Sequence, residues 1–469
     1  MKEISIFLIL SLSIILAQPA HSQSGSPAPS RHFFWVSFTD KAASPYKATE
    51  PGAFLSPRAI ERRERLGIPV TPRDFPPNPA YLEGLVENGA KIHHTSRWLN
   101  AATIHGDSTL LPAIDVLPFV DTIWYAGPYL EKETARVERS KEMKKLKSKK
   151  LPEQYYGYGA RQIQALNGDT LHQTGYRGEG VLVAVLDGGF TGADISPFFD
   201  SLRADGRLLP SMDMVDMDRE VWESSSHGTK VLSCMGANVP YVMVGTAPDA
   251  TYVCIKTEDT RSENRVEECH WVAGLEYADS LGADVVNSSL GYTTFSDKRM
   301  NYQARDLTGR TSVASRAADI AAQKGILVVT SAGNEGNSEW RRIGIPADAA
   351  EALSVGATSL DGKLASFSSV GPTADRRIKP DVVAPGAWVT LADAYRYQVT
   401  IGSGTSFAAP ITAGLVACLR QAFPEKGVEA IFDGIRESGD KADVPNAQVG
   451  FGLPDFVKAL QLIGEEESR

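Results

Sequence analysis

From about Tyr155 onward, short continuous apolar runs alternate with longer runs in which apolar residues recur at helical spacing. The short runs are typical of strands buried on both faces, and the longer runs of helices. This alternation predicts an α/β domain with a parallel sheet flanked by helices, whose functional groups gather at the carboxyl ends of the strands. The expected strands are 181–186, 250–255, 284–290, 326–330 and 353–356, and the expected helices are 228–237, 266–280 and 314–324.

The preceding segment, from Phe33 to Tyr125, has the pattern of a smaller α+β domain. Ser56 followed by Pro57 marks the start of a charged helix, because serine caps a helix and proline suits its first position. A second helix is expected after Tyr81. The order strand-helix-strand, repeated once, predicts a small ferredoxin-like domain. Its expected strands are 33–38, 91–93, 101–104 and 120–125.

Residues 1–22 have the pattern of a secretory signal peptide. Lys2 supplies the positive start, an apolar run extends from Ile4 to Ala17, and Ala20-His21-Ser22 gives the small-residue cleavage pattern. The apolar run is too short to span a membrane comfortably. We therefore expect cleavage after Ser22 and a secreted protein, either extracellular or periplasmic.

A basic stretch at 131–151 separates the two expected domains. A solvated linker, an exposed helix and a nucleic-acid arm are all compatible with such a charge run. Its place between a small first domain and a large second domain of an exported protein favours a processing segment, because exposed linkers are readily cleaved. The expected organisation is a signal peptide at 1–22, an α+β domain at 23–130, the linker at 131–151 and an α/β domain at 152–469.

The composition narrows the choice of partners and cofactors. The 469-residue chain has a net charge of −9, which gives no indication of nucleic-acid binding. Its four cysteines permit disulfides without fixing their pairing. Cys254 and Cys269 are the better candidates for a pair, whereas Cys234 and Cys418 lie in apolar helical runs that suit free thiols equally well. No Cys-x-x-Cys or His-x-x-x-His spacing indicates a structural zinc site.

Ser406 is the candidate nucleophile. It follows Gly404-Thr405 at the start of an apolar helical run. A glycine-rich approach leaves room for a substrate carbonyl, and the unpaired N–H groups of the first helical turn favour developing negative charge. An isolated Thr-Ser pair would more often only cap the helix. Other stretches of the chain supply the groups that such a nucleophile needs.

Asp187, His227 and Asn334 are these groups. Asp187 ends an expected strand, His227 stands among small residues at the entry to a helix, and Asn334 follows another strand within Gly333-Asn334. The histidine can take the serine proton and later donate it, and the carboxylate can hold the imidazole in the required tautomer. The Asn334 amide and the N–H of Ser406 can share an oxyanion.

Four segments carry the strongest motifs, namely Val185-Leu186-Asp187-Gly188-Gly189, His227-Gly228-Thr229, Ala332-Gly333-Asn334 and Gly404-Thr405-Ser406-Phe407-Ala408-Ala409-Pro410. Two secondary motifs are Gly245-Thr246-Ala247-Pro248-Asp249-Ala250 and Asn287-Ser288-Ser289-Leu290-Gly291. With these segments in this order, residues from about 152 to 462 resemble the subtilisin-like serine endopeptidases, in which the chain order is also Asp, His, Ser.

The resemblance implies a seven-stranded parallel sheet and hydrolysis of peptide bonds through an acyl-enzyme. It implies that Ser289, Leu290 and Gly291 pair with substrate backbone as an edge strand. The first domain is similar in element order to the family's propeptides, which inhibit the active site of their own chain. The resemblance implies no required cofactor. Many relatives bind calcium, so a calcium ion is possible here, but it stays unassigned because no family calcium loop maps onto this sequence.

This sequence departs from many relatives at Gly188 and at Phe407, where threonine or serine and methionine are common. The expected partners are protein or peptide substrates and the chain's own propeptide, with no nucleic acid and no membrane span after signal removal. Two alternatives remain open. One is a non-catalytic binding protein on the same scaffold, and the other is a transpeptidase in which an amine resolves the acyl-enzyme.

Overall fold

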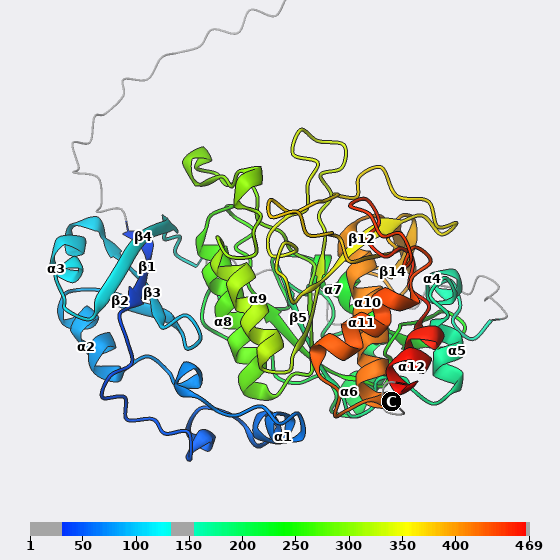
Figure 1. Cartoon of the computed structure of the whole chain (residues 1–469), viewed down its shortest axis with the longest axis horizontal. Coiled ribbons are helices and arrows are strands. Elements are labelled where there is room, and N and C mark those ends of the chain that lie inside the picture. Colours follow the sequence, from blue (N-terminus) through cyan, green and yellow to red (C-terminus); the bar gives the residue numbers. More distant parts are fainter. Residues whose placement is uncertain (1–30, 133–153, 466–469) are drawn as a thin grey trace, which may run out of the picture.

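The computed structural model of this chain describes residues 31–132 and 154–465. The expected signal peptide at 1–22 and nearly all of the basic linker at 131–151 lie outside the described residues. Within the described ranges, no helix is both long enough and apolar enough to cross a membrane. Figure 1 shows two domains side by side, a smaller one formed by the first part of the chain and a larger one formed by the rest.

The first domain is built on a four-stranded antiparallel sheet in the order β2-β3-β1-β4. This order, with helices between the strands, confirms the ferredoxin-like arrangement. Ser56 caps the first helix as expected, because its hydroxyl accepts a hydrogen bond from the N–H of Ala59 at 3.2 Å. The elements are β1 (Arg31–Phe38), α1 (Pro57–Arg65), α2 (Pro79–Glu87), β2 (Lys91–Ser96), β3 (Ala101–Asp107), α3 (Leu111–Asp115) and β4 (Val120–Pro128).

The second domain contains a seven-stranded sheet, also as expected, in which every pairing is parallel. Its order is β13-β12-β11-β10-β5-β9-β6. The strands are β5 (Leu182–Asp187), β6 (Met212–Asp213), β9 (Thr251–Lys256), β10 (Val285–Ser288), β11 (Leu327–Ser331), β12 (Leu353–Thr358) and β13 (Val382–Pro385). Two antiparallel pairs lie outside it, namely β7 (Asn238–Val239) with β8 (Met243–Val244), and β14 (Val389–Ala392) with β15 (Val399–Gly402).

Helices cover both faces of the large sheet, which explains why its strands are continuously apolar. Along β5, Leu182, Ala184 and Leu186 join the core under α8 and α9, whereas Val183 and Val185 join the core under α7 and α10. The helices of this domain are α4 (Ala160–Gln164), α5 (Gly168–Gln173), α6 (Asp200–Ala204), α7 (His227–Gly236), α8 (Val266–Leu281), α9 (Val313–Gln323), α10 (Thr405–Ala422), α11 (Val428–Ser438) and α12 (Phe456–Glu465).

The expected disulfide between Cys254 and Cys269 is wrong, because the two side chains lie on opposite faces of the large sheet. All four cysteines are buried free thiols. Cys254 lies on β9 with its side chain in the core under α7 and α10, whereas Cys269 of α8 lies in the core on the opposite face of the sheet. Proximity in sequence suggested this pair, but the sheet separates the two side chains.

The first domain packs its sheet against α8 of the second domain (Figure 1). Along β1, Phe34 and Val36 belong to the small domain's own core with Leu85 of α2. Phe33 and Trp35 point to the other face and join the core that contains α8. Strand β1 is therefore apolar on both faces because the second domain covers the face that its own helices leave open.

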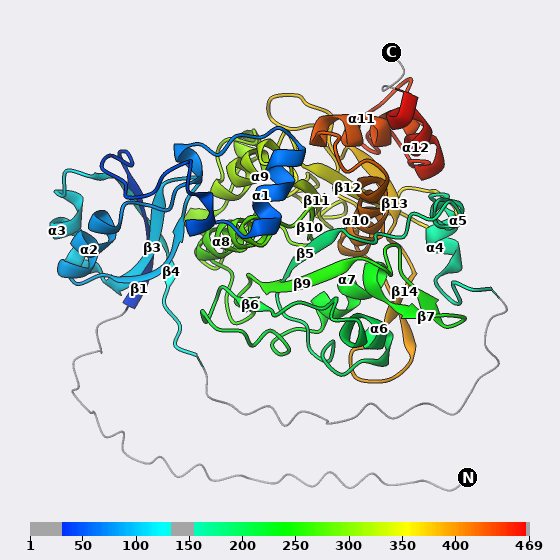
Figure 2. The ribbon, with the colours of Figure 1, turned by 90° about the horizontal axis from the view of Figure 1, so that it is seen from below.

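Helix α1 lies apart from the four-stranded sheet, along the second domain (Figure 2). Its Arg62 and Arg63 are each 1% exposed, and both pair with the carboxylate of Asp279 on α8. Arg97 reaches the same carboxylate at 3.0 Å. Burial raises the pKa of Asp279, but the three arginine charges outweigh it, so the net pKa lies below the ordinary value of 3.8.

We expect Asp279→Asn to destabilise the full chain by about 3–5 kcal/mol, because it leaves buried arginine charges without their partner. Urea unfolding of the full chain at pH 7 measures the effect. Since the folded pKa is lowered, the stabilisation is present above pH 3.8 and is lost as the pH falls through the folded value. The two unfolding curves should therefore converge in acid.

The matched control is Glu50→Gln, which removes the exposed pair between Lys47 and Glu50 at 2.9 Å in the same domain. Its urea midpoint should stay within experimental error of the parent, because exposed ion pairs contribute little. Equal midpoints for Asp279→Asn and Glu50→Gln would contradict the buried-network interpretation.

Candidate active site

Asp187 is the last residue of β5, at the carboxyl edge of the sheet, and its side chain is buried. One carboxylate oxygen accepts a hydrogen bond from the N–H of Gly188 at 2.8 Å. The strand alternation places this side chain at the rim where loops and helix N-termini meet. A buried carboxylate needs a hydrogen-bonding or charged partner, and His227 supplies it.

His227 is the first residue of α7, and Ser225 anchors its backbone N–H through a 3.1 Å hydrogen bond. Its Nδ1 lies 2.9 Å from both carboxylate oxygens of Asp187. This contact makes Nδ1 the protonated nitrogen and leaves Nε2 free to accept a proton. Burial lowers the pKa of His227, but the Asp187 charge and hydrogen bond outweigh it, so the net pKa lies above 6.5.

Ser406 is the second residue of α10, directly behind the turn at Gly404. Its hydroxyl donates to the carbonyl of Ser289 at 3.3 Å, and the Ser289 hydroxyl donates to the carbonyl of Ser406 at 2.8 Å. The ring of the next residue, Phe407, lies 5.7 Å from the ring of His227. The structure therefore brings α7 and α10 together here, with the Ser406 hydroxyl turned to Ser289 rather than hydrogen-bonded to His227.

Asn334 lies in the loop after β11, and its side chain is oriented by Thr405. Its amide oxygen accepts hydrogen bonds from the N–H and the hydroxyl of Thr405, at 2.8 and 3.0 Å. The amide N–H₂ group is left for another acceptor. A Cβ placed on Gly404 would lie 3.7 Å from both this amide nitrogen and the backbone nitrogen of Ser406. Glycine at this position keeps the space between the two donors empty.

The segment Ser289-Leu290-Gly291 continues beyond the end of β10, with Gly291 exposed and Leu290 partly exposed. The structure assigns it no strand, so the expected run 284–290 is shorter than predicted, and pairing with a substrate backbone stays a prediction. The carbonyls of Ser289 and Leu290 accept hydrogen bonds from the hydroxyls of Ser406 and Ser331, whereas Gly291 is exposed beside them.

Sequence reasoning missed Glu258, which lies two residues beyond β9, the strand that pairs with β5. Its half-buried carboxyl accepts a hydrogen bond from the hydroxyl of Tyr292 at 2.6 Å. Burial is the largest cause of the raised pKa of Glu258, and the nearby charges of Glu263 and Asp187 add to the increase. The signal was present in the sequence, because a carboxylate directly after a buried strand was the same pattern that identified Asp187.

Three carboxyl groups of this loop, those of Glu258, Glu263 and Glu267, have oxygen atoms within 4.8 Å of one another. Oxygen donors are the type that calcium takes. Desolvation raises the pKa of all three carboxyl groups, and neighbouring carboxylate charges add to the increase for Glu258 and Glu267. Glu267 also accepts hydrogen bonds from the backbone N–H groups of Asn264 and Asp259, so its carboxyl already has structural partners.

Comparison with known families matches residues 178–452 to the subtilase family (peptidase S8) and residues 33–145 to the peptidase S8 propeptide domain of Bacteroidota. Subtilisin NAT of Bacillus subtilis subsp. natto is 30% identical over 345 residues, which cover 72% of this chain and 75% of that protein. Serine protease AprX of Bacillus subtilis (strain 168) is 28% identical over 305 residues, covering 59% and 63%.

Solved structures share the fold. The crystal structure of MycP1 from Mycobacterium smegmatis has a TM-score of 0.52 at 21% identity and covers 68% of this chain and 87% of that chain. MycP1 with its N-terminal propeptide removed gives a TM-score of 0.51 at 24% identity and covers 64% of this chain and 96% of that chain. With a family match across more than half of its length, the chain belongs to the subtilase family of serine-type endopeptidases and carries an N-terminal propeptide domain of that family.

Proposed function

We propose that this protease hydrolyses peptide bonds through Asp187, His227 and Ser406. The observation that carries the proposal is the 2.9 Å contact between Nδ1 of His227 and Asp187, at the rim where the N-terminus of α10 presents Ser406. It directs the free Nε2 away from the carboxylate, which is the arrangement a general base needs.

The reaction begins when the Ser406 hydroxyl turns from the carbonyl of Ser289 toward Nε2 of His227. Oγ attacks the carbonyl carbon of the peptide bond while its proton passes to Nε2. The C–N bond of the tetrahedral intermediate then breaks as His227 donates that proton to the leaving amine nitrogen. Water attacks the resulting ester, its proton passes to His227, and Oγ regains a proton as the acid product leaves.

The oxyanion of each tetrahedral intermediate is proposed to bind between the amide N–H of Asn334 and the backbone N–H of Ser406. Thr405 holds the Asn334 oxygen through two hydrogen bonds, so the amide N–H₂ group is oriented before substrate arrives. Donors fixed in advance stabilise the developing charge without reorganising during the reaction. The positive end of the α10 dipole acts in the same direction.

We further propose that substrate backbone pairs with Ser289, Leu290 and Gly291, and that the chain is made as a secreted zymogen. The segment leaving the propeptide domain contacts the loop after β9, where Arg261 donates to the carbonyl of Glu131 at 2.7 Å. Lys132 pairs with Asp218 at 2.7 Å. These contacts hold the C-terminal end of the propeptide domain against the enzyme, as expected for an intramolecular inhibitor. The basic residues of 131–151 supply the processing site.

The proposed organisation keeps the boundaries expected from the sequence: signal peptide 1–22, propeptide domain 23–130, processing linker 131–151 and catalytic domain 152–469. The similarity to the minor extracellular protease Epr of Bacillus subtilis (strain 168) supports an extracellular location. N-terminal sequencing of the mature protein would locate both cleavage sites.

Ser406→Ala should leave the purified precursor at full length and abolish labelling by a fluorophosphonate probe, because the nucleophile is gone. The wild-type chain should release a mature form whose N-terminus lies within or directly after residues 131–151. Ser403→Ala is the matched control, since Ser403 is exposed and its hydroxyl only accepts a hydrogen bond from the N–H of Trp388. Casein hydrolysis by Ser406→Ala at the wild-type rate would overturn the assignment.

Asn334→Asp should lower kcat by at least about 10²-fold with little change in KM, because an oxygen replaces the N–H donor while the acceptor for Thr405 is kept. In subtilisin, loss of the corresponding side-chain donor costs about 10²–10³ in kcat. Steady-state kinetics on a peptide amide measure the effect. Asn337→Asp, at an exposed position bonded to Ser366, should retain wild-type kcat, and equal losses in the two variants would argue against an oxyanion role.

The acid limb of the kcat/KM profile should have an apparent pKa above 6.5, because His227 must be neutral to act as base and Asp187 raises its pKa. Activity is lost as the pH falls through that value.

The positive charge of Lys230 lowers the pKa of His227, so Lys230→Gln should move the acid limb of the profile to higher pH. Profiles of kcat/KM against pH, measured on an uncharged substrate, test both expectations. An acid limb with an apparent pKa below 6.5 in the wild-type enzyme would contradict the assignment of His227 as general base.

A further inference from the structure

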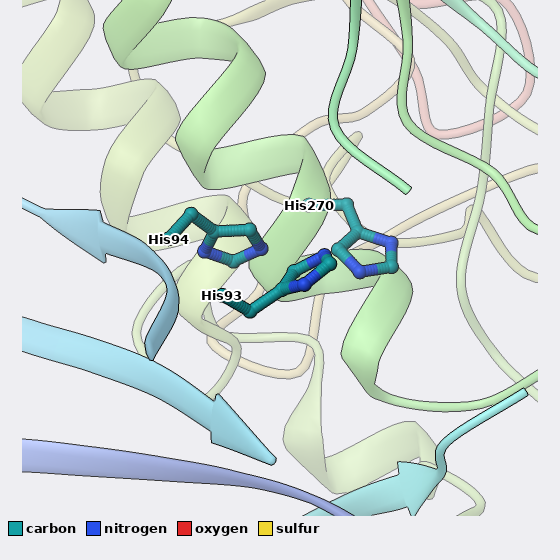
Figure 3. A group of neighbouring side chains, drawn as sticks. All are labelled: His93, His94 and His270. Atoms are coloured by element: carbon teal, nitrogen blue, oxygen red, sulfur yellow. The ribbon is translucent and has the colours of Figure 1, made fainter. Parts of the chain in front are cut away.

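Three histidines from different parts of the chain meet at the interface between the two domains. His93 and His94 come from β2 of the propeptide domain, and His270 comes from α8 of the protease (Figure 3). The centroids of their rings are separated by 5.0, 5.4 and 5.3 Å. The rings thus form a nearly equilateral triangle, and none of them belongs to the proposed active site.

Two of the three rings, those of His94 and His270, are buried, and several of their nitrogen atoms lack hydrogen-bond partners. His94 and His270 are 7% and 1% exposed. Within the described part of the chain, Nε2 of His94 and both ring nitrogens of His270 make no hydrogen bond of good geometry, although the backbone of Thr257 is close enough to His270 to act on its pKa. Leaving buried polar atoms unpaired costs free energy, so native cores almost always supply a partner. The unpaired ring nitrogens therefore indicate that a ligand, rather than another side chain, satisfies them.

The spacing of the rings fits a tetrahedral metal site. With Zn–N distances of about 2.0–2.1 Å, and each ring centroid a further ~1.1 Å from the metal, three coordinating imidazoles have centroids roughly 5.2 Å apart. The observed triangle has nearly this size. One nitrogen from each ring can be chosen so that all three lie within 4.8 Å of one another. Tetrahedral zinc needs roughly 3.4 Å between them, which rotation of rings already in place can supply.

The surroundings also match a metal site. Nε2 of His93 lies 3.1 Å from the carbonyl of Met214, so it donates there and leaves Nδ1 as the ligand atom. Ligating histidines commonly donate their second nitrogen to a backbone carbonyl in this way. His94, alone of the three histidines, also lines a cavity of about 400 Å³ that is open to solvent, so an ion can approach the cluster from the His94 side.

We propose that His93, His94 and His270 bind one transition-metal ion of the Zn²⁺ class, which joins the propeptide domain to the protease. Two ligands come from the propeptide and one from the enzyme, so the ion binds tightly only while the two are docked. Binding to the docked form stabilises it by mass action. The metal thereby retains the propeptide, and its removal favours release.

The protonation state of the rings agrees with this role. Burial lowers the pKa of all three histidines, well below 6.5 for His94 and His270. Neutral imidazole is the form that binds metal. The proposal stands on the ring positions and the unpaired nitrogens, and it does not depend on the identity of the catalytic residues.

The test uses the full chain carrying Ser406→Ala, so that the two domains stay covalently joined whether or not the protein processes itself. After chelator treatment and dialysis, Zn²⁺ titration by calorimetry should give one site per chain and raise the Tm. Co²⁺ should give the intense visible absorption of a tetrahedral complex. His94→Phe and His270→Gln should each weaken Zn²⁺ binding at least ~100-fold, because loss of outer-shell partners alone costs 10–100-fold.

His105→Phe is the matched control. His105 lies on the neighbouring strand, its ring is 6.2 Å from that of His93 and stacks on Tyr129, and it is outside the triangle. It should keep the Zn²⁺ affinity within about twofold and keep the Co²⁺ spectrum. Absence of a stoichiometric site in the Ser406→Ala chain would overturn the proposal, as would equal affinity in the ligand and control variants. If His94→Phe fails to fold, His270→Gln and the Co²⁺ spectrum decide the outcome.

Discussion

The buried carboxylate of Asp187 imposes the central constraint on the enzyme domain. The carboxylate lies at the end of β5, shielded from solvent. It accepts hydrogen bonds from the N–H of Gly188 and from the ring of His227. This pairing fixes the tautomer of the imidazole and raises its pKa. The first turn of α7 must begin where the strand ends, and α10 must then bring Ser406 to the same rim.

A second constraint acts on α8, which is covered on both sides. One side packs on the large sheet, and the other carries Asp279 and His270 toward the propeptide domain. Buried arginines of α1 need the Asp279 charge, because arginine stays protonated even when buried. The propeptide therefore docks through specific polar partners as well as through the apolar face of β1. The proposed metal site would add to the same interface.

The sequence predicted much of this architecture. Buried strands and helices were identifiable from periodicity, and Asp187, His227, Asn334 and Ser406 were identifiable from residue type and position in short motifs. Strand β6 was missed because two residues carry too little pattern, and β13 because it ends at a proline, which is typical of an edge strand and argues against a central one. The segment after β10 was predicted as strand, but its backbone lacks a neighbouring strand to pair with.

The sequence by itself determined which side chains can do chemistry and which local elements carry them, because periodicity, caps and turns depend on residues a few positions apart. Only the tertiary structure decided which distant groups meet. It separated Cys254 from Cys269 by a sheet, turned the Ser406 hydroxyl to Ser289, and brought His270 beside two histidines about 175 positions earlier in the chain. These contacts depend on strand order and domain docking, which arise from the packing of the whole core and leave no local pattern in the sequence.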